Sequence, residues 1–79
     1  MNKEEFLKEM GWFLEYYDTK LNKTQSQIWF NNFSYLEQKH LSDILNLHIK
    51  TDIDNRFPAI GKITQLISKA KTKSGWFPS

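Results

Sequence analysis

The chain has 79 residues, which is enough for only one hydrophobic core, and its hydrophobic fraction of 39% excludes a membrane-spanning protein. It has no cysteine, which excludes disulfides and thiolate chemistry, and its acidic start lacks the apolar run of a signal peptide, so a cytoplasmic protein is expected. The net charge of +2 is unevenly distributed, because residues 1–54 hold six lysines against all nine acids and residues 55–79 hold five cations and no acid.

The first predicted element is an amphipathic helix from Lys3 to about Tyr17. Asn2 and Glu5 have the spacing of a capping box, in which each side chain binds the other residue's backbone N–H. Gly11 inside this pattern weakens a helix, so we expect a close contact there. The apolar positions recur at helical spacing and comprise Phe6, Leu7, Met10, Phe13, Leu14 and Tyr17.

Two further helices are predicted after a polar loop. Thr24 with Gln27 has capping-box spacing and predicts the start of the second helix. Ser34 with Glu37 forms another box of the same type and predicts the start of the third helix, which runs to about Lys50.

The fourth predicted helix follows Pro58 and runs from about Ala59 to Lys71, because proline is favoured at a helix start and disfavoured inside one. Its last turn is rich in lysine, and the pair Ser74–Gly75 is a stop signal. The sequence therefore predicts an all-α protein, a compact bundle of about four short helices over residues 1–71 with a short C-terminal tail at 72–79.

Catalytic chemistry is not expected. Glu37 and His40 have an E-x-x-H spacing that binds metal in some bundles, but those sites need a second such motif, which the sequence lacks. The three glycines form no phosphate-binding loop, and no nucleophile is paired with a base. We expect no catalytic residue, metal or cofactor, and we expect His48 to lie half-buried on its helix with a hydrogen-bond partner.

The sharpest functional signal is the basic and aromatic C-terminal segment. Tryptophan is enriched at binding hot spots, and clustered lysines suit an anionic partner surface. The predicted partner-binding residues are Lys69, Lys71, Lys73, Trp76 and Phe77. Two alternatives remain, since the aromatics can pack against the first helix and the lysines can simply solvate the end of the chain.

The stretch from Trp29 to Ile63 resembles the phage replicative helicase loader and inhibitor family. The similarity lies in the pair Trp29–Phe30, in the run Leu45–Ile49 with its Leu-x-x-His-Ile-type ending, and in the turn Arg56–Ile63 with its Phe-Pro pair. The chain departs from that pattern at Ala59, where the family favours Thr or Ser, and at Lys62, where an acid is common.

This resemblance implies a small helical protein that acts in the cytoplasm of a bacterial host. The partner that it implies is a protein, the bacterial or phage replicative helicase or its loader, bound stoichiometrically. Two other functions are open: a phage inhibitor of a host or defence enzyme that handles nucleic acid, and a small DNA-binding regulator. The helix pair on either side of Ser34 is the candidate helix-turn-helix for the last of these, although the third helix begins without the Arg and Asn that usually read base edges.

Overall fold

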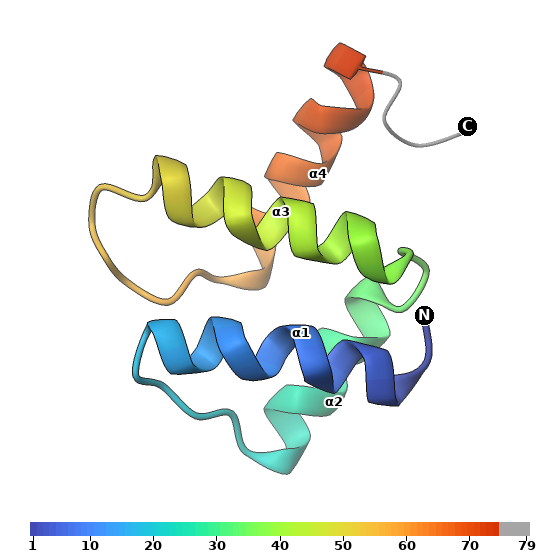
Figure 1. The fold of residues 1–79 in the computed structure, drawn as a ribbon, viewed down its shortest axis with the longest axis vertical. Coiled ribbons are helices and arrows are strands. Elements are labelled where there is room, and N and C mark those ends of the chain that lie inside the picture. Colours follow the sequence, from blue (N-terminus) through green and yellow to red (C-terminus); the bar gives the residue numbers. More distant parts are fainter. Residues whose placement is uncertain (75–79) are drawn as a thin grey trace.

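The computed structural model describes residues 1–74, with the side chains of residues 1–70, and confirms an all-α fold. The described residues contain no strand and four helices, α1 (Lys3–Tyr16), α2 (Lys23–Phe33), α3 (Gln38–Thr51) and α4 (Ile60–Ser74). Helices α1 and α3 lie side by side and run in the same direction, α2 crosses behind α1, and α4 packs on α3 with its last turns extending away from the other helices (Figure 1). The fourth helix therefore runs three residues past its predicted end at Lys71.

The first helix begins as the sequence predicts. The Asn2 side chain accepts a hydrogen bond from the Glu5 backbone N–H at 2.8 Å, and the Glu5 carboxylate accepts one from the Asn2 backbone N–H at 3.1 Å. These reciprocal bonds satisfy donors that would otherwise be unpaired in the first turn, and the acids Glu4 and Glu5 suit the positive helix start. One face of the helix is then buried against α3.

The predicted starts of the second and third helices are wrong. The capping box of α2 is formed by Asn22 and Gln25, two residues before the predicted pair. Ser34 ends α2 instead of beginning α3, and α3 begins after Glu37, whose side chain makes no capping bond. The chain turns here because Leu36, only 1% exposed, is drawn into the core. The Met1 ammonium group fixes the turn by donating to the carbonyl oxygens of Ser34 and Leu36, at 2.7 and 2.9 Å.

The core is a single cluster of aromatic and aliphatic side chains. Phe13, fully buried, lies at its centre and contacts the rings of four neighbours at centroid distances of 5.2–6.0 Å. These neighbours are Trp12, Tyr17, His48 and Phe57. Phe57 belongs to the segment between α3 and α4. The Phe13 ring therefore joins α1, α3 and that segment.

Gly11 has no packing partner, so the predicted close contact is wrong. It is exposed, and a Cβ atom built there would have nothing within 4 Å. Gly11 instead lies beside a shallow groove of about 600 Å³ that is formed with Leu14, Glu15 and the loop Asp18–Leu21. The fold of the chain itself thus gives no reason for glycine at this position.

Replacing Gly11 with alanine should therefore stabilise the protein by about 0.5–1 kcal/mol, because glycine in a helix interior costs that much in chain entropy. Urea unfolding followed by circular dichroism measures the difference. Gly61→Ala is the matched control, because a Cβ atom at Gly61 would also have open space around it. Gly61 lies in the first turn of α4, not in a helix interior, so we expect a smaller gain in stability there. A loss of stability in Gly11→Ala would contradict the open surroundings of this position.

Candidate functional site

Helix α4 has one face in the core and a basic face outside it. Ile63 and Ile67 are buried, at 0% and 3% exposure, against α3. Lys62 and Lys69 are exposed, and they lie seven residues apart, so two turns of helix bring them to the same side. With no acid between residues 55 and 79, no carboxylate of this segment neutralises that row.

The structure places the predicted binding residues unequally. Lys69 is exposed on α4. The side chains of Lys71 and Lys73, farther along α4, lie outside the described residues. Trp76 and Phe77 lie outside the described residues. Lys62 was missed by the sequence analysis, although its seven-residue spacing from Lys69 could have indicated it.

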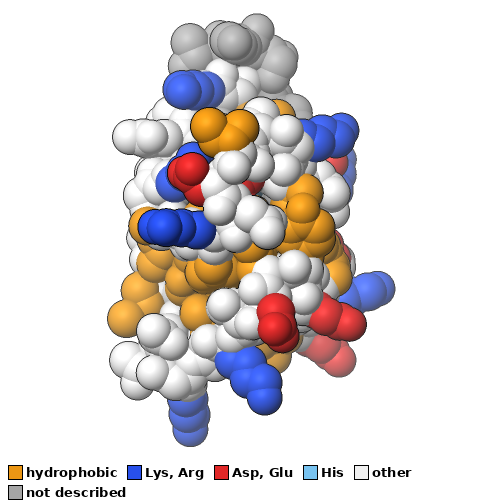
Figure 2. Space-filling model, turned by 90° about the vertical axis from the view of Figure 1, so that its left-hand side faces the viewer, with side chains coloured by type: hydrophobic (Ala, Val, Ile, Leu, Met, Phe, Trp, Pro, Cys, Tyr) orange, Lys and Arg blue, Asp and Glu red, His pale blue; other side chains and the backbone are white. Residues whose placement is uncertain are grey.

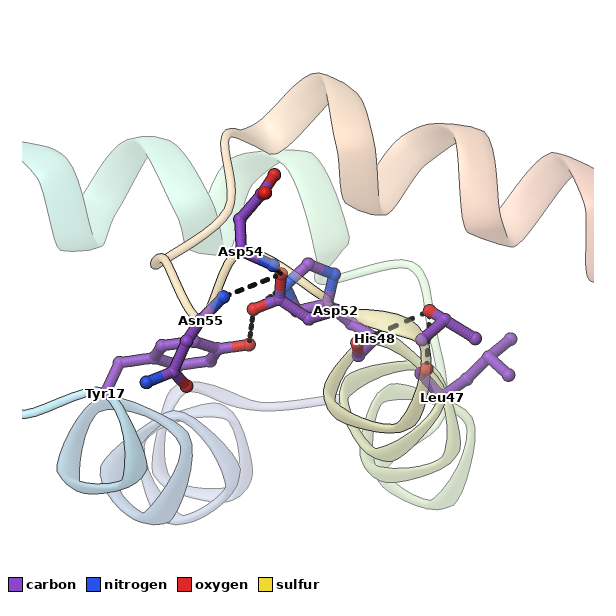
Figure 3. Close-up of polar contacts among 7 residues, drawn as sticks. Tyr17, Leu47, His48, Asp52, Asp54 and Asn55 are labelled. Carbon is purple, nitrogen blue, oxygen red and sulfur yellow. Dashed lines mark hydrogen bonds and ion pairs between the residues drawn. The ribbon is translucent and has the colours of Figure 1, made fainter.

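The segment between α3 and α4 is held by one carboxylate. The Asp52 carboxylate accepts a hydrogen bond from the Tyr17 hydroxyl at 2.7 Å, and its other oxygen accepts the backbone N–H groups of Asp54 and Asn55 at 3.1 and 3.2 Å (Figure 3). Asn55 is in the left-handed region with φ of 55°, which asparagine tolerates better than most residues. These bonds join α1 to the α3–α4 segment and fix the shape of its first turn.

His48 lies behind this carboxylate. Its side chain is 1% exposed, and Nε2 lies 3.7 Å from Asp52 Oδ2. Neither ring nitrogen has a hydrogen-bond partner among the described residues, so the predicted half-buried, hydrogen-bonded histidine is wrong. Burial lowers the pKa of His48, and Lys62 lowers it further, against the opposing effects of Asp52 and of the Arg56 backbone. The ring is therefore neutral near pH 7.

The hydrogen bond between the Tyr17 hydroxyl and the Asp52 carboxylate shifts the pKa values of both groups. The bond from Tyr17 is the main reason that the pKa of Asp52 lies below its ordinary value. Burial, followed by the bond to Asp52, raises the pKa of Tyr17. Because the Asp52 side chain is only 5% exposed and the His48 ring 1%, a substrate cannot reach the cluster, and its role is to hold the loop.

A second buried carboxylate joins α1 to the start of α3. Glu9 accepts hydrogen bonds from Trp12 Nε1 at 2.9 Å and from Gln38 Nε2 at 2.8 Å. Burial raises the pKa of the Glu9 carboxyl, but the bonds from Trp12, Gln38 and Ser42 outweigh that effect and leave the pKa below its ordinary value. Glu9 is therefore an ionised structural group.

The E-x-x-H pair is brought together without the other ligands of a metal site. Glu37 Oε2 lies 3.9 Å from His40 Nδ1. Within the part of the chain that the structure describes, no three His, Cys, Asp or Glu side chains are grouped so that they could hold a metal ion. None of the described helices is long and apolar enough to cross a membrane.

Comparisons with protein-family models, with curated proteins and with solved structures give no match for this chain. The function therefore has to be argued from the residues and their geometry, together with the resemblance of the stretch from Trp29 to Ile63.

Proposed function

We propose that this chain is a small binding protein of the helicase loader and inhibitor kind, which acts by stoichiometric contact with a bacterial or phage replicative helicase or with its loader. The observation that supports this best is the basic face of α4. Lys62 and Lys69 are exposed there on one side of the helix, and α4 extends away from the other helices (Figure 1).

A row of cations on an extending helix suits an acidic protein surface. Charge complementarity of this kind speeds association and fixes the register of a complex more than it adds affinity. Figure 2 shows a band of hydrophobic side chains across one face of the molecule, with side chains of both charges, Lys and Arg as well as Asp and Glu, projecting around it.

The test is the binding of the purified chain to the replicative helicase of a Gram-positive host, measured by isothermal titration calorimetry at low and at physiological salt. We expect the double variant Lys62→Glu/Lys69→Glu to bind at least about tenfold more weakly than the wild type, because reversed charges face the acidic surface. The loss should be larger at low salt, where exposed charges are less screened.

The matched control is Lys20→Glu/Lys23→Glu, which makes the same change of net charge at two exposed lysines far from α4 in the chain. It should bind as the wild type does. Failure of the wild-type chain to bind either the helicase or its loader would end the proposal, and equal losses in the two double variants would remove α4 from the contact.

The same lysine row also suits nucleic-acid phosphates, so a small DNA-binding regulator is the second candidate. Phosphate contacts make DNA affinity fall steeply with salt. A mobility shift at low salt that is lost in Lys62→Glu/Lys69→Glu would favour this candidate, and the absence of any shift at low salt would exclude it.

A further inference from the structure

The outer face of α1 carries two leucines with an exposed glycine between them. Leu7, Gly11 and Leu14 are spaced by four and then three residues, so helical geometry places them on one side of α1. Leu7 is 49% exposed and Leu14 is half-buried. Gly11 is open to solvent, and a Cβ atom built on it would have nothing within 4 Å. Another backbone can therefore approach closely between the two leucines.

A groove borders this face at the C-terminal half of α1. It is the groove of about 600 Å³ described above, and it is lined by Leu14 on the helix and by Leu21 on the loop that leads to α2 (Figure 1). Gly11 also lines it, and because Gly11 has no side chain, nothing from that position restricts access to the groove. The groove is large enough to take a leucine side chain from a second helix.

Two opposite charges flank Gly11 on the same helix. Lys8 lies three residues before Gly11 and Glu15 four residues after it, and both side chains are exposed. None of the ion pairs among the described residues uses either of them. The leucines have the mirrored spacing, since Leu7 lies four residues before Gly11 and Leu14 three after it. When the direction of the helix is reversed about Gly11, each leucine reaches the level of the other leucine and each charge reaches the level of the opposite charge.

We propose that this face of α1 binds a second copy of the chain, in an antiparallel pair of α1 helices that cross at Gly11. Leu7 of each copy enters the groove of the other beside Leu14, and Lys8 of each copy pairs with Glu15 of the other. Because the same residues contribute on both sides, a two-fold axis closes the contact and gives a dimer. A parallel pair would instead place Lys8 level with Lys8 and Glu15 level with Glu15, which charge complementarity disfavours.

The acids at the two ends of this face do not prevent the pairing. Glu4 lies seven residues before Gly11 and Asp18 seven after it, so the two would be level in an antiparallel pair. Packed helices cross at an angle of about 20–50°, however, and therefore separate toward their ends. Asp18 has also left the helix, because α1 ends at Tyr16 and Asp18 has φ of 51°.

The dimer is expected to be weak, because each copy contributes only one helix and one loop to the contact. It therefore dissociates at the low concentrations used for circular dichroism, and the unfolding experiment on Gly11→Ala reports on the monomer. The contact contains no residue of α4. This inference consequently stands apart from the proposed function, and either can fail without the other.

Sedimentation equilibrium of the full chain, from micromolar to millimolar concentration, tests the dimer. The wild type should pass from the 9.5 kDa of one chain to twice that mass. Gly11→Gln should weaken dimerisation by at least about tenfold, because its side chain keeps the two helices apart. Gly61→Gln is the matched control, since Gly61 is another exposed glycine with open space around it but lies on α4, and it should dimerise as the wild type does.

A charge swap tests the direction of the two helices. Lys8→Glu and Glu15→Lys should each weaken the dimer by about tenfold at low salt, because each places like charges together at two symmetry-related positions. The double variant Lys8→Glu/Glu15→Lys should restore wild-type affinity, since it exchanges the charges and keeps their pairing. Circular dichroism checks that every variant is folded. A wild type that stays monomeric at every concentration overturns the proposal, as does a dimer that Gly11→Gln leaves intact or that the double variant does not restore.

Discussion

Replacing Phe13 with alanine should remove about 3–5 kcal/mol from the free energy of unfolding, because it deletes a fully buried ring and leaves a cavity. A domain of this size is stabilised by only about 4–12 kcal/mol in total. The variant should therefore lose roughly a quarter or more of the total stability. The loss is expected to be this large because Phe13 contacts rings from α1, α3 and the α3–α4 segment together.

Thermal and urea unfolding, followed by circular dichroism, measure the effect. Phe13→Leu keeps most of the apolar volume and should lose only about 1–2 kcal/mol. Tyr35→Ala is the control for removal of an exposed ring, and it should stay within about 0.5 kcal/mol of the wild type because Tyr35 is 66% exposed. A loss below about 1 kcal/mol in Phe13→Ala would contradict its place at the centre of the core.

The number and order of the helices follow from the spacing of apolar residues, which reports directly on burial. The Asn2–Glu5 box was predicted correctly because it directly precedes the apolar stripe that it caps. Before α2, two boxes overlap, and the structure uses Asn22 in place of Thr24. Asparagine ranks above threonine as an N-cap residue, so this choice could have been made from the sequence.

The error at Ser34 has a different origin. Ser34 and Glu37 do have the spacing of a capping box. The chain nevertheless turns there, because Leu36 is buried and because the Met1 ammonium group binds the turn. Both are tertiary contacts, and the second joins residues more than thirty positions apart. Local patterns do not contain that information, so tertiary packing overrode the capping preference.

The candidate site was predictable only where it is helical. The lysines of α4 follow from composition and spacing, and the row through Lys62 and Lys69 could have been read from the helical period. The cluster of Tyr17, His48 and Asp52 could not, because the hydrogen bond between Tyr17 and Asp52 spans 35 residues and matches no motif.

The buried histidine should make the protein less stable in mild acid. The folded-state pKa of His48 is lowered from its ordinary value of 6.5, mainly by burial, whereas the unfolded chain keeps the ordinary value. Below pH 6.5 the unfolded state therefore binds a proton that the folded state does not, and the stabilisation present above pH 6.5 is lost as the pH falls toward the folded-state pKa.

Because a single proton is involved, the free energy of unfolding falls by at most about 1.4 kcal/mol per pH unit. Burial is the main cause of the lowered pKa of His48 and Lys62 on α4 adds to it, against the opposing effects of Asp52, the C-cap residue of α3, and of the Arg56 backbone. The lowered pKa values of Asp52 and Glu9 act in the same sense but only below about pH 4.5, so they do not mask the effect of His48.

Urea unfolding between pH 7 and pH 5 measures this dependence, and two variants isolate it. His48→Gln and His48→Phe both remove the titrating ring, the first with a polar side chain and the second with an aromatic one that preserves the edge contact with Phe13. Both should flatten the stability profile over this range, whatever their stability at pH 7. An unchanged slope in both variants would show that another group causes the acid sensitivity, and a wild-type profile that is already flat would contradict the buried, neutral state of His48.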